Sequence, residues 1–112
     1  MKLVEGVVED VTVLEPHGRL DSAAAKEFGD RLTALVQAGR SAILVDLKSI
    51  AYISSAGFHV LLDANRAMAK RQGKLALCGV IGEVRRLFEI GAFHEMFVIC
   101  QTQADGIDML RS

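Results

Sequence analysis

The sequence contains few aromatic residues and almost no excess of either charge. Its 112 residues include one Tyr, five Phe and no Trp, and 13 Lys and Arg nearly balance 14 Asp and Glu. Proteins that bind nucleic acids rely on stacking aromatics or on a strongly basic surface, and this chain offers neither. We therefore expect no direct contact with nucleic acid. The length predicts a single domain, residues 1–112.

Cysteine and long apolar runs are equally scarce. Cys78 and Cys100 each follow a short apolar run, so we expect two buried thiols and no disulfide framework. No CxxC pair or Cys/His cluster has the spacing of a metal site, and nothing indicates a cofactor. No apolar run approaches the roughly 18 residues of a membrane helix, and the N-terminus lacks the apolar region of a signal peptide. The sequence thus predicts a cytoplasmic protein that does not insert into membranes.

The charges that are present are unevenly spread. The first 63 residues are acidic on balance, whereas the stretch from residue 66 to residue 86 has a single acid, Glu83. We expect either solvated helix faces or a basic flank that meets an acidic partner or a phosphate group. The basic residues of this stretch are Arg66, Lys70, Arg71, Lys74, Arg85 and Arg86.

Short β-rich segments alternate with helical ones along the whole chain. Unbroken apolar runs are typical of central strands, and apolar spacings of three and four residues predict helices. The order β-β-α-β-α-β-α-β-α predicts an α/β fold, a mixed sheet of about four to five strands packed with about four helices, with an N-terminal hairpin at the edge. The expected strands are residues 3–8, 11–14, 42–45, 75–78 and 96–100, with an interruption at 17–19 and a loop at 48–53. The expected helices start at Asp21 or Ser22 and end at Gly39, run from Ser54 or Ser55 to about Gln72 before Gly73, and span residues 82–90 and about 104–110.

The segment before the second helix carries the main candidate site. It ends with Ser54, Ser55, Ala56 and Gly57 at the start of that helix. The first turn of a helix carries free N–H groups and a partial positive charge. A serine there caps the helix, and the same N–H groups hold a phosphoryl group well. Capping and phosphorylation are compatible, so both interpretations stay open.

Together with its flanks, this segment resembles the STAS domain, the module of the bacterial anti-sigma factor antagonists. The likeness covers nearly the whole chain. It rests on Gly18-Arg19-Leu20-Asp21, on Ile43–Asp46 followed by Tyr52-Ile53-Ser54-Ser55-Ala56-Gly57-Phe58, and on Val84-Arg85-Arg86-Leu87-Phe88 with Gly91. The resemblance implies the same mixed α/β fold and a protein that binds partners rather than an enzyme, with no catalytic residues.

The resemblance also implies a phosphorylation switch. The unphosphorylated antagonist binds an anti-sigma factor that is itself an ATP-dependent serine kinase, with a histidine-kinase-like ATPase fold, and so releases the sigma factor. Phosphorylation by this kinase ends the binding, and a separate serine phosphatase restores it. By position the phosphoacceptor is Ser55, with Ser54 as the less favoured alternative. The implied or candidate partner-binding residues are Asp21, Ser54, Gly57, Phe58 and His59.

Three positions depart from the family pattern. The Asp before the acceptor is Ser54 here, the next Ser or Thr is Ala56, and the usual Leu after Gly57 is Phe58. The first change removes a negative charge and adds a second hydroxyl beside the acceptor. Core packing is the alternative to partner contact for Phe58, and a plain exposed helix position is the alternative for His59.

The sequence favours three other functions less. An enzyme is disfavoured because no GxSxG motif surrounds Ser55 and the histidines show no triad pattern with Asp. A small nucleotide-binding protein would use Gly79-Val80-Ile81-Gly82, but this is an incomplete phosphate-loop motif and a tight turn explains it. Within the resemblance, an accessory subunit of a transporter or of a lipid-trafficking ATPase would bind its partner without being phosphorylated.

Overall fold

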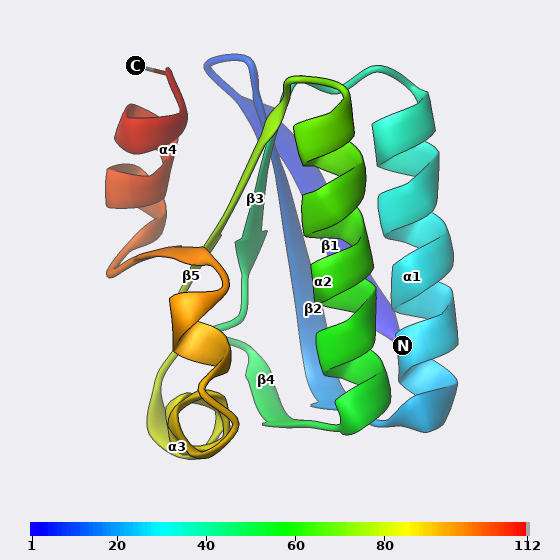
Figure 1. Ribbon diagram of the computed structural model, residues 1–112, viewed down its shortest axis with the longest axis vertical. Coiled ribbons are helices and arrows are strands. Elements are labelled where there is room, and N and C mark those ends of the chain that lie inside the picture. The colour runs from blue at the N-terminus through cyan, green and yellow to red at the C-terminus, as the bar shows by residue number, and fades with distance from the viewer. Residues whose placement is uncertain (112) are drawn as a thin grey trace.

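The computed structural model describes residues 1–111 as a mixed sheet with helices on both faces (Figure 1). The predicted order of strands and helices is confirmed, with one additional strand, β4, and one short 3-10 helix, η1. The elements are β1 Lys2–Val8, β2 Val11–Leu20, α1 Ser22–Gln37, β3 Ala42–Asp46, β4 Ile50–Ile53, α2 Ser55–Lys70, β5 Lys74–Cys78, α3 Gly82–Ile90, η1 Phe93–Glu95, β6 Val98–Cys100 and α4 Gln103–Arg111.

The strands lie in the order β1-β2-β3-β5-β6, and β4 pairs with the end of β2. β1 and β2 are antiparallel, whereas every other pair is parallel. Strand–helix–strand connections bring each following strand back in the same direction, which explains the parallel pairs. Helices α1 and α2 lie side by side on one face, and α4 packs on the other (Figure 1). β1 is the first strand in this order and forms a hairpin with β2, so the hairpin predicted at the sheet edge is confirmed.

Strand β2 is longer than the sequence indicated. The expected interruption at residues 17–19 is a bulge, where Gly18 has φ +98° and the register with β4 shifts between Gly18 and Arg19. Glycine adopts this φ without steric cost, and a bulge bends the strand that carries it. The bent end of β2 pairs with residues 50–53, where the sequence pattern predicts a loop. That expectation was wrong because a four-residue strand has too little periodicity to be recognised alone.

Two boundaries also differ from expectation. Helix α2 ends at Lys70, and the left-handed residue that follows it is Gln72, with φ +59°, rather than Gly73. Gly73 instead avoids a steric clash, because a Cβ atom at this position would lie 2.8 Å from Met68 Cε. Strand β6 starts at Val98 rather than Met96, because Met96 is the C-cap of η1.

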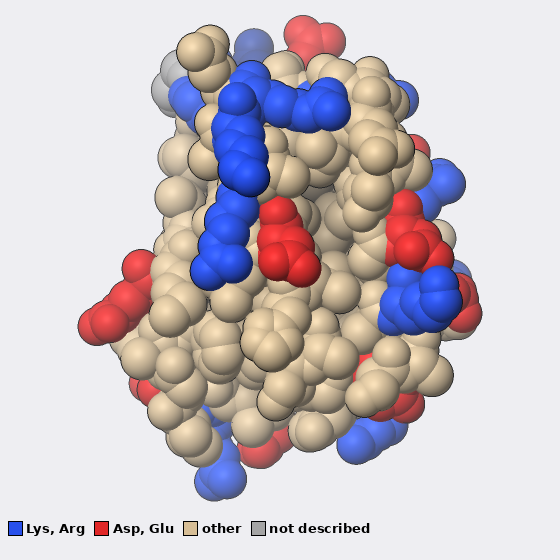
Figure 2. Space-filling view, turned by 45° about the vertical axis from the view of Figure 1, so that its right-hand side comes forward, with Lys and Arg blue, Asp and Glu red and all other residues tan. Residues whose placement is uncertain are grey.

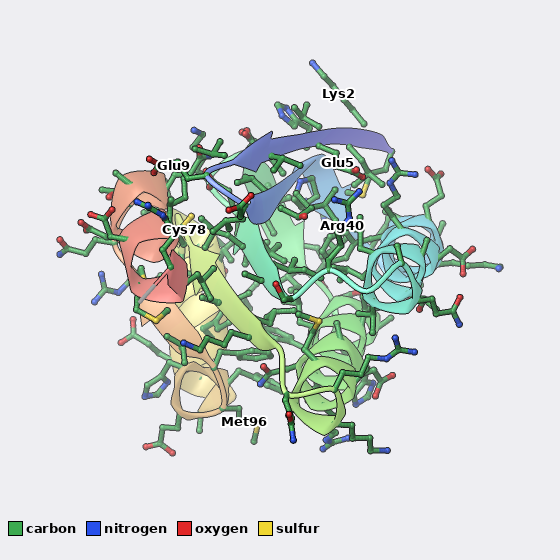
Figure 3. All side chains as sticks on the ribbon, turned by 90° about the horizontal axis from the view of Figure 1, so that it is seen from above. Lys2, Glu5, Glu9, Arg40, Cys78 and Met96 are labelled. Carbon is green, nitrogen blue, oxygen red and sulfur yellow. The ribbon has the colours of Figure 1, made fainter. Side chains whose placement is uncertain are left out.

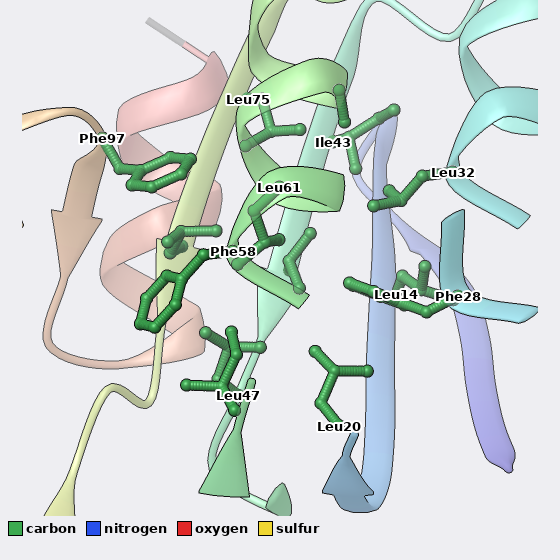
Figure 4. Close-up of a cluster of buried hydrophobic side chains, with 14 of the residues drawn as sticks. Leu14, Leu20, Phe28, Leu32, Ile43, Leu47, Phe58, Leu61, Leu75 and Phe97 are labelled. Carbon is green, nitrogen blue, oxygen red and sulfur yellow. The ribbon is translucent and has the colours of Figure 1, made fainter. Parts of the chain in front are cut away.

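The hydrophobic core lies on both faces of the sheet. The larger cluster fills the space between the sheet and the helices α1, α2 and α3 (Figure 4). The smaller cluster lies under α4 and includes Val11, Leu44 and Ile107. Strands β3 and β5 are thus covered on both sides, which is why their apolar runs are unbroken. The largest fully buried side chains of the first cluster include Leu14, Leu20, Phe28, Leu32, Leu61 and Phe88.

Candidate functional site

The candidate site lies where β2 and β4 end side by side. Leu20 and Ile53, the last residues of the two strands, are partners in the parallel register. The next residue on each chain segment, Asp21 or Ser54, is the N-cap of a 16-residue helix. The backbone N–H of Ser54 donates to the carbonyl of Leu20 at 2.9 Å and joins the two helix starts. The pairing of β2 with β4 therefore brings residues 21 and 54–55 together.

The hydroxyl of Ser54 is held inside the structure. Its Oγ donates to the carbonyl of Leu20 at 2.9 Å and accepts the backbone N–H of Gly57 at 3.2 Å. The residue is half-buried, and its backbone is extended, as an N-cap requires. Ser54 is therefore the capping residue of α2, and its hydroxyl already serves two structural hydrogen bonds.

The side chain of Ser55 is exposed at the first helical position of α2. Within residues 1–111, no hydrogen bond to its hydroxyl is found. The first turn of α2 contains no acidic side chain, so the partial positive charge of the helix start is not neutralised from within that turn. The geometry thus separates the two serines: Ser54 caps the helix, and Ser55 presents a free hydroxyl beside the N–H groups that favour an anion.

Asp21 contributes a negative charge at the neighbouring helix start. Its Oδ1 accepts the backbone N–H of Ala24 at 2.9 Å, and the residue is exposed. Its carboxylate caps α1 just as Ser54 caps α2, so the first of the two expected capping residues, rather than Ser22, is the N-cap. The position of Asp21 beside Ser54 places this carboxylate on the same end of the molecule as Ser55.

Gly57 lets the start of α2 approach the end of β2. A Cβ atom at this position would lie 2.8 Å from Ile53 Cγ1 and 3.1 Å from the side chain of Leu20. Both neighbours are buried in the core, so neither has free space into which to move. The residue is itself buried, and its contribution to the site is to position the first turn of α2.

We expect Gly57→Ala to lower the free energy of unfolding by about 1–2 kcal/mol, because the added methyl group overpacks the core. The matched control is Gly29→Ala in the middle of α1. There a Cβ atom would lie 3.1 Å from Val60 Cγ2, a half-buried side chain that can turn aside, and alanine favours the helix. Urea unfolding of both variants checks this. Equal stability of Gly57→Ala and the parent chain would contradict it.

The structure corrects one candidate partner contact. Phe58 is only 5% exposed, and its ring stacks on Phe93 with centroids 3.9 Å apart and meets the edge of Phe88 at 4.8 Å. Its ring faces the core (Figure 4). Core packing, the alternative interpretation, is therefore the one that the structure supports. His59, the next residue, is exposed on α2.

Sequence reasoning missed an arginine–tyrosine pair next to the serines. The guanidinium of Arg19 lies 4.5 Å from the centre of the Tyr52 ring, and the two residues are register partners on β2 and β4. Arg19 is exposed, and Tyr52 is half-buried. The pair adds a positive charge and an aromatic surface immediately before Leu20 and Ile53. Only the β2–β4 pairing reveals it, so no local sequence signal was available.

The basic residues at the end of α2 do not lie beside Ser55. Figure 2 shows Lys and Arg side chains gathered over the end of the molecule where α2 stops. Lys70 is 15 positions after Ser55 on the same helix, or about 22 Å away at the rise of an α-helix. Arg85 and Arg86 lie on α3 beside Glu89 and Glu83, at 3.5 and 3.6 Å. The basic residues that follow α2 are therefore remote from the serines, whereas α3, which carries Arg85 and Arg86, packs against β4.

A second polar cluster occupies the ends of β3 and β5. The carboxylate of Asp46 is 1% exposed and accepts hydrogen bonds from the backbone N–H of Lys48 at 3.0 Å and from Gln103 Nε2 at 3.1 Å. A Cβ atom on Gly79, which has φ +67°, would lie 2.5 Å from Asp46 Oδ1. The glycine after β5 is thus required by a tight turn over a carboxylate, which disfavours a phosphate loop there.

Cys78 lies in this cluster, and burial raises the pKa of its thiol from 9.0 to about 12, with a further contribution from the Asp46 carboxylate. Between these two values the unfolded chain loses the proton first, so the folded state becomes less stable as the pH rises. We expect the free energy of unfolding to fall by up to about 1.4 kcal/mol per pH unit in this window from this thiol. Cys78→Ala should show a shallower decline in urea titrations at alkaline pH. Identical slopes would contradict the assignment.

The described part of the chain offers neither a catalytic triad nor a metal cluster. Within residues 1–111, no hydrogen bond joins Ser55 to a histidine, and no three His, Cys, Asp or Glu side chains converge as metal ligands. His17 instead contacts Glu15 at 3.1 Å, and His94 lies 3.5 Å from the carbonyl of Phe88. None of the helices in this range combines the length and the hydropathy that crossing a membrane requires.

The chain is similar to known proteins over most of its length. The family model for the STAS domain matches residues 4–106. BtrV of Bordetella bronchiseptica, which bears the name of an anti-sigma factor antagonist, is 32% identical over 103 residues, covering 92% of this chain and 89% of the relative.

Two proteins with solved structures share the fold. An anti-sigma factor antagonist of Thermotoga maritima, so named, superposes with a TM-score of 0.91 at 20% identity, over 98% of this chain and 95% of that one. Unphosphorylated SpoIIAA superposes with a TM-score of 0.77 at 18% identity, over 99% of each chain. The phosphorylated form of this Bacillus protein gives a TM-score of 0.74 at 18% identity, over 98% of this chain and 100% of that one. The match of the family model over most of its length places this chain in the STAS domain family.

Proposed function

We propose that this protein is an anti-sigma factor antagonist controlled by phosphorylation of Ser55. The observation that carries the proposal is that two adjacent serines differ in exposure and in hydrogen bonding. The hydroxyl of Ser54 makes two structural hydrogen bonds, whereas Ser55 is exposed at the start of α2. Relatives that bear the name of anti-sigma factor antagonists support the same conclusion, and SpoIIAA among them has been solved in a phosphorylated form.

In this proposal the unphosphorylated chain binds an anti-sigma factor that is also a serine kinase, and the sigma factor is released. The kinase uses ATP to phosphorylate Ser55, and the phosphorylated antagonist dissociates. A serine phosphatase then removes the phosphate and restores the form that binds. The antagonist acts by binding and not by catalysis. Free thiols at Cys78 and Cys100 suit the reducing cytoplasm, where this exchange takes place.

The binding surface in this proposal surrounds the joined helix starts. Asp21 and Ser55 are exposed there, and Arg19 with Tyr52 extends the surface along β2 and β4. His59 lies one turn further along α2. Gly57 and Ser54 act by positioning this surface, because one is buried and the other is engaged in the cap.

Phosphate mapping tests the proposal. The chain is incubated with its cognate anti-sigma kinase and ATP, and the modified residue is located by mass spectrometry. We expect phosphate on Ser55 in the parent chain and in Ser54→Ala, and none in Ser55→Ala. Ser54→Ala should also lose about 1 kcal/mol of stability because it removes the cap. Phosphate on Ser54, or on neither serine with a kinase active on another substrate, would overturn the proposal.

A further inference from the structure

Within residues 1–111, strand β1 forms a long edge of the sheet without a neighbouring strand on its outer side. It has seven residues and pairs only with β2 among the strands. Seen from above, it runs along the margin of the molecule, with Lys2 pointing away and no helix beyond it (Figure 3). The opposite edge, β6, has three residues. Natural proteins commonly protect sheet edges by making them short, so β6 is protected in this way and β1 is not.

The backbone groups on this edge can be assigned from the hairpin. Glu9 and Asp10 both have positive φ, 51° and 71°, as in a two-residue type I′ turn, and Val8 faces Val11 across it. In such a hairpin the pair that flanks the turn is hydrogen-bonded, and the pattern then alternates along the strand. Leu3, Glu5 and Val7 therefore direct their backbone N–H and carbonyl groups away from β2, where another strand can pair with them.

The side chains of β1 are unusually apolar for an exposed strand. Val4 is 45%, Val7 58% and Val8 40% exposed. Val8 lies opposite Val11, which is buried under α4, so Val4 and Val8 occupy the face of the sheet on which α4 packs. On the other face the charge of Glu5 is paired with Arg31 at 2.7 Å and does not protect the edge. The edge thus combines free hydrogen-bonding groups with an apolar face.

We propose that β1 pairs with β1 of a second copy of this chain, antiparallel, with the two-fold axis at Gly6. This register places Val4 opposite Val8 of the partner subunit and Glu5 opposite Val7 of the partner subunit. It also brings the side chain of Lys2 toward the acidic Glu9-Asp10 turn of the partner subunit. Moving the axis to Glu5 would instead set Val4 opposite Gly6 of the partner subunit and Val8 opposite Lys2 of the partner subunit, so the apolar contacts of Val4 with Val8 between the strands would be lost. Self-complementarity of apolar side chains and of charge therefore selects this register and a second copy as the occupant.

None of the serine-site residues belongs to β1. The β1–β2 turn and the start of α2 lie at opposite ends of the molecule (Figure 1). Two copies joined through β1 form one continuous sheet and present two Ser55 side chains. This inference does not depend on the proposed function, because it concerns a different edge of the fold.

Cross-linking tests the register. In this pairing Gly6 faces itself at a position without hydrogen bonds, where Cα atoms are about 4.5 Å apart, within the range that a disulfide spans. In a Cys100→Ser background, Gly6→Cys should form a covalent dimer under mild oxidation. Val8→Cys is the matched control, because residue 8 faces residue 4 of the partner rather than itself. Equal cross-linking of the two variants, or none of Gly6→Cys, would overturn the register.

Sedimentation equilibrium tests the dimer itself. The parent chain should show a concentration-dependent dimer between micromolar and near-millimolar protein. Val4→Lys should raise its dissociation constant by about tenfold or more, because the change occurs twice in the interface. Val98→Lys, on the exposed edge strand β6, should have no effect, and circular dichroism confirms that both variants fold. A monomer at every concentration, or a dimer weakened by Val98→Lys alone, would overturn the proposal. Phosphate mapping on Ser55 is unaffected by either result.

Discussion

Phosphorylation of Ser55 is expected to weaken the complex with the anti-sigma kinase by about 100- to 1000-fold. A phosphoserine carries about −1.5 to −2 charges at neutral pH. Burying such a group against a partner without matched bases costs several kcal/mol in desolvation and repulsion, and a penalty of about 3–4 kcal/mol gives this factor. The carboxylate of Asp21, at the neighbouring helix start, adds to the negative charge that the partner would have to accept.

The fold itself should hardly respond. The free N–H groups and the partial positive charge at the start of α2 stabilise an anion at that position. We therefore expect the melting temperature of the phosphorylated chain to equal or slightly exceed that of the unmodified chain. The effect of the phosphate belongs to the interface and not to folding.

Isothermal titration calorimetry checks the affinity, with enzymatically phosphorylated and unmodified protein titrated into the kinase. Ser55→Ala is the matched control, since it should bind as tightly as the unmodified chain and stay bound in the presence of ATP. Ser55→Asp is a weaker mimic because it adds one charge rather than nearly two. Affinities of the phosphorylated and unmodified chains within about threefold of each other would contradict a switch at this site.

The sequence allowed the order of elements to be predicted because that order depends on local patterns. Helix periodicity, unbroken apolar runs and terminal glycines each act within a few residues. The site could be predicted only in part. Asp21 and Ser54 were recognisable as caps, but their neighbourhood depends on the pairing of β2 with β4, which joins segments about thirty positions apart through a bulge at Gly18.

The choice between the two serines illustrates the same limit. Both stand before a helix, and the rules for N-caps accept either. What distinguishes them is a hydrogen bond from Ser54 to the carbonyl of Leu20, on another strand. The Arg19–Tyr52 pair likewise exists only across β2 and β4. Long-range register, and not composition, therefore decides which side chains of the site are available to a partner.

Phe58→Ala is expected to lower the free energy of unfolding by about 3–5 kcal/mol and the melting temperature by on the order of 20 °C. The ring of Phe58 is buried between Phe93 and Phe88, so truncation removes two aromatic contacts and leaves a cavity. A domain of this size has only about 5–15 kcal/mol of stability, so the variant will be partly unfolded in mild denaturant. Urea and thermal unfolding measure the loss. The adjacent exposed residue supplies the control, since His59→Ala should stay within about 0.5 kcal/mol of the parent.

A milder variant separates packing from partner contact at this position. Phe58→Leu keeps an apolar side chain in the core and should cost about 1–2 kcal/mol while the chain stays folded. Because the ring faces Phe88 and Phe93 and not solvent, the affinity of folded Phe58→Leu for the kinase should match that of the parent chain. A tenfold loss of affinity without loss of stability would show that a partner draws this ring out of the core. Equal affinity would instead place the recognition surface on the exposed residues around Ser55. Together with the large instability of Phe58→Ala, it would show that Phe58 acts by packing the start of α2 against α3 and η1.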